Sequence, residues 1–95
     1  MVKLELGGKD PSCVCDDALV QNAAASLVDG AMYNTVQSCC SVGRMYVHAA
    51  ISEAFVAAFV DVVKTFKVGD PMVEGTYVGA ITRAAQLDVL DARVF

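Results

Sequence analysis

This chain has few charged residues, yet it also lacks a long run without charge. The first feature is unusual for a free-standing soluble domain, and the second argues against a membrane-spanning protein. Only 19% of its 95 residues are charged and 56% are hydrophobic, whereas an average soluble domain is about 25% charged. Even the apolar stretch 49–63 carries Glu53 and Asp61, and no window of about 18 residues is free of charge, as a membrane-spanning helix requires. We therefore expect no membrane partner. The composition favours a piece of the core of a larger α/β protein.

Basic residues and targeting signals are scarce as well. Seven Lys and Arg residues stand against eleven Asp and Glu, which gives a net charge of −4. The basic residues are scattered along the chain, whereas a nucleic-acid partner requires a basic face, so we expect no such partner. Met1 leads directly into alternating sequence without the apolar segment of a signal peptide.

The four cysteines form two local pairs, Cys13 with Cys15 and Cys39 with Cys40. They lack the spread of a secreted disulfide framework, so we expect reduced thiols and a cytoplasmic chain. With one histidine in the chain, these spacings do not match a zinc site, and we expect no metal. Cys13 and Cys15 lie on an expected buried strand, and we expect both to pack in the core.

The apolar spacing predicts a small α/β unit. Period-2 alternation indicates a strand, and apolar residues at helical spacing indicate a helix. The chain therefore predicts strands over 2–6, 12–15 and 44–48, helices over 19–31, 52–66 and 82–94, and loops over 33–41 and 72–80. Strands that alternate with helices are typical of a parallel sheet covered on both sides. We expect a partial three-layer parallel sheet with covering helices.

Two motifs resemble signatures of the aldehyde dehydrogenase superfamily. Leu4-Glu5-Leu6-Gly7-Gly8-Lys9 is similar to the family's Glu-Leu-Gly-Gly-Lys motif, and the segment from Asn34 through Cys39 to Arg44 resembles its cysteine motif. The separation of the two motifs is also that of the family, and Gly69-Asp70-Pro71 resembles a later landmark. The resemblance covers essentially the whole chain. It implies that residues 1–95 form part of the catalytic domain, without the cofactor-binding domain and the C-terminal part.

The resemblance implies a concrete chemistry. Cys39 would attack an aldehyde as its thiolate, and Glu5 would activate the water that hydrolyses the resulting thioester. NAD or NADP would accept the hydride, with Leu6, Gly7 and Gln86 as cofactor contacts. The substrate would be a small-molecule aldehyde. The full-length enzyme would be a homo-oligomer, a dimer or a tetramer.

The small size of the chain and the valine at position 36 leave two alternatives to an active dehydrogenase open. A chain of 10.0 kDa without a Gly-x-Gly-x-x-Gly motif lacks the dinucleotide fingerprint, so we expect the isolated chain to be inactive as a dehydrogenase. Val36 stands where the family has glycine, and valine does not readily adopt a positive φ. The two alternatives are a cofactor-independent thiol esterase that uses Cys39 and Glu5, and a non-catalytic truncated remnant.

Overall fold

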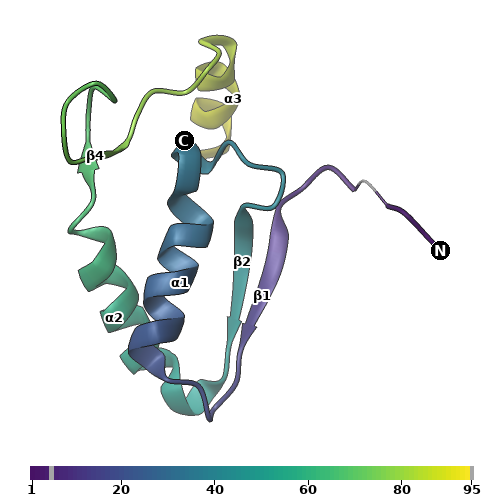
Figure 1. Cartoon of the computed structure of the whole chain (residues 1–95). Coiled ribbons are helices and arrows are strands. Elements are labelled where there is room, and N and C mark those ends of the chain that lie inside the picture. Colours follow the sequence, from purple (N-terminus) through teal and green to yellow (C-terminus); the bar gives the residue numbers. More distant parts are fainter. Residues whose placement is uncertain (5, 95) are drawn as a thin grey trace.

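The computed structural model describes residues 1–4 and 6–94, so Glu5 lies outside the described residues. The chain alternates strands and helices (Figure 1). Its elements are β1 (Asp10–Val14), α1 (Val20–Met32), a 3-10 turn (Tyr33–Val36), β2 (Val42–Val47), a second 3-10 turn (Ala49–Ile51), α2 (Ser52–Val63), β3 (Lys67–Val68), β4 (Thr76–Val78) and α3 (Ala85–Val94).

Two small parallel sheets organise the fold. β1 pairs with β2, with Cys13 opposite Tyr46 and Val14 opposite Val47, and α1 provides the crossover that parallel strands require. β3 pairs with β4, also in parallel. The predicted parallel α/β arrangement with covering helices is therefore confirmed.

The core lies where α1 and α2 pack on each other and on the sheet. The two helices lie side by side (Figure 1), and Ala24 of α1, Phe55 and Ala58 of α2 and Val14 of β1 form one buried cluster. The small alanine side chains allow close approach of the helix backbones. The Phe55 and Phe59 rings lie 5.9 Å apart in a tilted arrangement that favours aromatic contact.

Packing is incomplete outside this core. The accessible surface is 7341 Å², against about 5,200 Å² for a folded monomer of this mass. The radius of gyration is 15.2 Å, against about 12 Å for a compact domain of this length. No residue of α3 is buried among those the structure describes. Much apolar surface of this chain is therefore not covered by the chain itself.

The predicted strand over 2–6 is wrong for the residues that the structure describes there. Leu4 and Leu6 are exposed, and residues 1–4 and 6–9 form no strand. Alternation produces a strand only where a neighbouring strand accepts its backbone hydrogen bonds, and β1 pairs with β2 alone. The expected burial of 12–15 is wrong as well, because only Val14 is buried there.

Other boundaries also differ from those predicted, and β1 and β2 each begin two residues earlier than expected. α2 ends at Val63 rather than at residue 66, because the following N–H groups bond back in tight turns and Phe66 stacks on Tyr77 at 3.9 Å. The expected loop over 72–80 contains β4, and α3 begins at Ala85. Within the described part of the chain, no helix has the length and apolar character to cross a membrane.

Candidate active site

Cys39 lies in a tight turn between α1 and β2. The Ser41 N–H donates to the Ser38 carbonyl at 3.1 Å, which places Cys39 and Cys40 at the two central positions of the turn. Ser41 is buried and fixes the turn, because its hydroxyl donates to the Ala31 carbonyl at 3.2 Å and its own carbonyl accepts from the Asp10 N–H. The cysteine pair is therefore held between the end of α1 and the start of β1.

Both groups of Cys39 that matter for a nucleophile are accessible. Its thiol is exposed, and within the described residues its backbone N–H donates no hydrogen bond. A free N–H beside a thiol can donate to an oxyanion that forms on the attacked carbonyl. The neighbouring Cys40 thiol instead lies 3.2 Å from the Ser38 hydroxyl.

Three consecutive residues before this turn adopt left-handed backbone. The φ angles are 50° at Asn34, 57° at Thr35 and 62° at Val36. Asparagine tolerates this region, whereas the β-branched side chains of threonine and valine crowd the backbone there. Val36 thus adopts the positive φ that valine does not readily take, which implies backbone strain at this position.

Gln37 links the cysteine turn to the segment before α3. Its Oε1 accepts from the Thr82 N–H at 2.7 Å, and its Nε2 donates to the Ala80 carbonyl at 3.5 Å. The Thr35 hydroxyl adds a bond to the Gly79 carbonyl at 3.3 Å. These bonds cross more than 40 residues of sequence and hold residues 79–82 beside the candidate nucleophile.

Gly8 presses against the backbone of Cys39. Its φ is +87°, and a Cβ added there would collide with the Cys39 carbonyl oxygen and lie 3.1 Å from the carbonyl carbon. Any other residue at this position would therefore push the two segments apart. Glycine at position 8 therefore allows the Glu-Leu-Gly-Gly-Lys motif to contact the cysteine motif.

Glu5 lies outside the described residues, and its two sequence neighbours lie near Cys39. Leu4 and Leu6 line a hollow of about 230 Å³ together with Gly8 and Cys39. The role of Glu5 stays a prediction.

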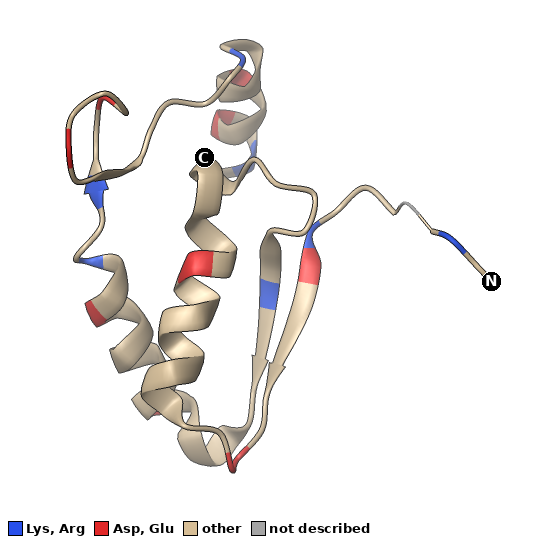
Figure 2. Cartoon of the chain, in the orientation of Figure 1, with Lys and Arg blue, Asp and Glu red and all other residues tan. Residues whose placement is uncertain are grey.

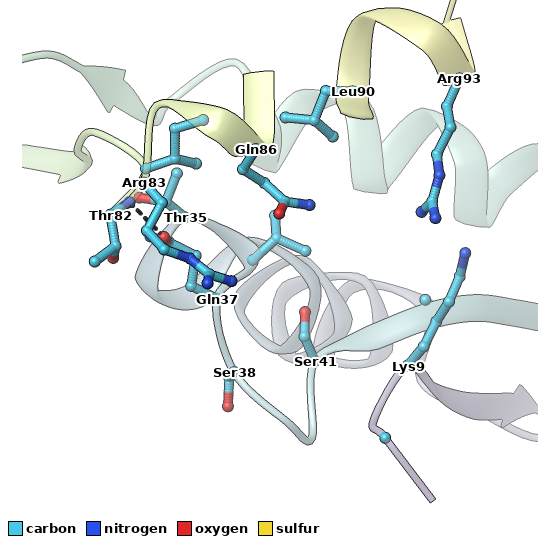
Figure 3. Close-up of a pocket in the computed structure, with 14 residues that line it drawn as sticks. Lys9, Thr35, Gln37, Ser38, Ser41, Thr82, Arg83, Gln86, Leu90 and Arg93 are labelled. Carbon is cyan, nitrogen blue, oxygen red and sulfur yellow. Dashed lines mark hydrogen bonds between the residues drawn. The ribbon is translucent and has the colours of Figure 1, made fainter. Parts of the chain in front are cut away.

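The cofactor contacts expected from the sequence divide between two hollows. Gly7 and Gln86 line a larger cavity of about 670 Å³, whereas Leu6 lines the smaller one beside Cys39 (Figure 3). Apart from its two chain neighbours, no atom of the described residues lies within 4 Å of the place where a Cβ of Gly7 would be, which leaves room for a flat group on that side. Among the described residues no acidic side chain lines the larger cavity, so none of them repels the phosphates of a dinucleotide. Gly7 and Gln86 fit such a group.

Cys13 and Cys15 differ from the prediction for them. Both thiols are exposed rather than packed in the core. Cys15 directly follows the end of β1, and residues two apart on an extended segment lie on the same side, so its thiol interacts with that of Cys13. The charge and hydrogen bond of Cys13 raise the pKa of the Cys15 thiol, with smaller contributions from burial and the two adjacent aspartates.

A sequence model described as the aldehyde dehydrogenase family matches residues 1–94. The chain belongs to the aldehyde dehydrogenase family. Vanillin dehydrogenase of Corynebacterium glutamicum is 40% identical over 93 residues, which are 98% of this chain and 19% of that protein. The chain thus spans about a fifth of the length of the curated aldehyde dehydrogenases that it matches.

Solved aldehyde dehydrogenases share this fold. An NAD-dependent benzaldehyde dehydrogenase from Corynebacterium glutamicum is 39% identical with a TM-score of 0.85, over 97% of this chain and 20% of that one. An NAD-dependent aldehyde dehydrogenase from Sinorhizobium meliloti is 33% identical with a TM-score of 0.88, over 95% of this chain and 18% of that one. The described elements are therefore arranged as in this family.

Sequence reasoning missed the positioning roles of Gln37 and Ser41. Both belong to the cysteine motif, but neither carries a signal for a hydrogen bond to a particular distant carbonyl or N–H. The positive φ at Asn34 was also unpredicted, although asparagine is the residue most often found in that region besides glycine.

The strain at Val36 gives a stability prediction. Val36→Gly is expected to raise the free energy of unfolding by about 1 kcal/mol, because relief of roughly 1–3 kcal/mol of backbone strain outweighs the about 0.5–1 kcal/mol that glycine adds to the entropy of the unfolded chain. Urea unfolding followed by circular dichroism measures the change. The control Val89→Gly, within the helix α3, should be destabilising. Equal destabilisation by Val36→Gly and Val89→Gly would contradict the inference that the backbone is strained at Val36.

Proposed function

We propose that this chain supplies the nucleophile Cys39 and the general base Glu5 of an enzyme that oxidises a small-molecule aldehyde to a carboxylic acid with NAD or NADP. The observation that carries the proposal is the contact of Gly8 with the Cys39 backbone, because Gly8 follows Glu5 by three residues in the sequence and belongs to the same motif. Membership of the aldehyde dehydrogenase family supports the reaction class.

The reaction begins at Cys39. Its thiolate attacks the carbonyl carbon of the aldehyde, a C–S bond forms, and the carbonyl oxygen becomes an oxyanion. The Cys39 N–H donates to that oxyanion, which the exposed position of this group in the turn supports. The product of this step is a thiohemiacetal on Cys39.

A bound nicotinamide cofactor would supply the hydride acceptor, and loss of the hydride from the thiohemiacetal carbon would leave a thioester on Cys39. Gly7 and Gln86, which both line the larger cavity, would hold the cofactor. Leu6 precedes Gly7 and would contact it from the side of Cys39. The relatives described as NAD-dependent, and a related glyceraldehyde-3-phosphate dehydrogenase complexed with NADP, support this class of cofactor.

Glu5 completes the cycle in the proposed mechanism. Its carboxylate takes a proton from a water molecule, whose oxygen attacks the thioester carbon. The C–S bond breaks, the carboxylic acid leaves, and Cys39 returns as a thiolate. The position of Leu4 and Leu6 beside Cys39 supports this assignment.

Residues 1–95 form part of a catalytic domain in this proposal. The cofactor-binding domain and the remaining C-terminal part come from other sequence, and the complete enzyme is a cytoplasmic homo-oligomer, a dimer or a tetramer. The apolar surface left exposed here supports the need for further packing. The isolated 95-residue chain is expected to reduce no NAD or NADP.

Absorbance at 340 nm tests the function. The product of the complete reading frame that contains these residues should reduce NAD or NADP only when an aldehyde is present, and mass spectrometry should find the matching acid. Hydrolysis of an activated ester without aldehyde-dependent nucleotide reduction would instead support the thiol esterase. A protein with neither activity would support the non-catalytic remnant.

A further inference from the structure

The larger cavity carries an unusual concentration of positive charge. Lys9, Arg83 and Arg93 line it, and among the residues that the structure describes no acidic side chain does. The chain as a whole has seven basic residues and a net charge of −4, so nearly half of its cations surround one cavity. Figure 2 shows basic positions at the start of β1 and on α3, with acidic positions on the same two elements that do not line the cavity.

Two of these cations face each other. The side chains of Lys9 and Arg93 point toward one another from opposite walls of the cavity (Figure 3). Within residues 1–4 and 6–94, neither forms an ion pair or a side-chain hydrogen bond. Like charges that face each other repel, and an anion between them turns the repulsion into two attractions.

The position of Lys9 is set by the backbone around it. Lys9 has a φ of 65°, and the stem of its side chain crosses the Cα of Gly43 in β2, where a Cβ would collide with it. The ammonium group is thereby directed over the start of β2 toward α3. Gln86 of α3 extends into the same cavity and adds a neutral donor (Figure 3).

We propose that an anionic oxygen group, a phosphate or a carboxylate, binds between Lys9 and Arg93. An ammonium and a guanidinium both donate strong charge-assisted hydrogen bonds to such oxygens. Arg83 adds positive charge to the same cavity. The anion has two possible sources, a phosphate of the dinucleotide or an acid group of the substrate. The dinucleotide source rests on the proposed function, which assigns Gly7 and Gln86 of the same cavity to the cofactor, whereas binding of an anion as such does not require the chemistry at Cys39 and Glu5.

Calorimetric titration of the 95-residue chain with inorganic pyrophosphate, and separately with glutarate, tests the site. Lys9→Gln and Arg93→Gln should each weaken the binding of the preferred anion about tenfold or more, as expected for loss of one charge-assisted bond. Arg93→Lys should retain part of the affinity. Lys64→Gln removes an exposed cation at the end of α2, outside the cavity, and should change the affinity less than about twofold.

A further variant tests whether the position of the Lys9 side chain matters in addition to its charge. Gly43→Ala keeps every charge but forces the Lys9 stem aside, so it should also weaken binding, with circular dichroism confirming that the fold is retained. Tighter binding of pyrophosphate supports a phosphate as the natural ligand group, and tighter binding of glutarate supports a carboxylate. Absence of binding by either anion, or equal affinity in Lys9→Gln, Arg93→Gln and Lys64→Gln, would overturn the proposal. Neither result would bear on acyl transfer at Cys39.

Discussion

Replacing Cys39 by alanine in the complete enzyme is expected to lower kcat for aldehyde-dependent nucleotide reduction by at least about 10⁴-fold. Removal of a catalytic nucleophile has effects of this size or larger, because the covalent route is lost altogether. The exposed thiol of Cys39, at the centre of a turn fixed by Ser41, supports its choice as that nucleophile. Stopped-flow absorbance at 340 nm measures the loss.

Cys40→Ala is the matched control. Cys40 occupies the other central position of the same turn and is also exposed, but its thiol lies beside the Ser38 hydroxyl. This change should reduce kcat less than about threefold, well within the tenfold that corresponds to about 1.4 kcal/mol in the barrier. A larger loss of kcat in Cys40→Ala than in Cys39→Ala would show that Cys40, and not Cys39, is the nucleophile.

Gly8→Ala is expected to have the second largest effect, a loss of about 10²-fold in kcat. The added methyl group would collide with the Cys39 carbonyl, so the two segments must separate. Misplacement of a reacting group by about 1 Å costs a factor of this order. The substitution changes no group that takes part in the chemistry, so its effect reports the contact of the two motifs. Steady-state kinetics with a single aldehyde measures it.

Gly75→Ala separates this contact from simple backbone strain. Gly75 also has a positive φ, +82°, but nothing lies within 4 Å of the place where its Cβ would be. Gly75→Ala should therefore introduce the same strain of an alanine at positive φ, while its kcat stays within about threefold of the wild-type value. Equal losses in the two variants would mean that the Gly8 contact has no part in catalysis.

The helices could be predicted because their signal is local. Ala24, Val28 and Ala31 of α1 recur at helical spacing and are buried, and Phe55 and Ala58 of α2 behave in the same way. An apolar face of this kind is determined by neighbouring positions in the sequence. The parallel order of β1 and β2 followed from the helix between them.

Strands depend on distant partners and were predicted less well. Residues 67–68 and 76–78 carry no alternation of useful length, and they form β3 and β4 only because each pairs with the other. Val2 and Leu4 alternate clearly, yet no strand lies beside them in the described part of the chain. The pattern records which face is apolar but not which strand supplies the hydrogen bonds.

The site was predictable where it rests on motifs and unpredictable where it rests on contacts. The two motifs identified Glu5 and Cys39 as candidates, and the role of each stays a prediction. The support of Gly8 for Cys39, the bonds of Gln37 and the facing cations Lys9 and Arg93 all join segments far apart in the chain. Such contacts depend on the folded arrangement, which the spacing of residues alone does not determine.

The decay of the thioester on Cys39 tests the central claim most directly. Rapid-quench mass spectrometry of the complete enzyme, mixed with aldehyde and oxidised nucleotide, follows this species in wild type and in Glu5→Gln. We predict that the thioester forms in both proteins but persists about 10² to 10⁴ times longer in Glu5→Gln, because the general base is lost. Equal decay in the two proteins, or an acyl group on a residue other than Cys39, would contradict the account.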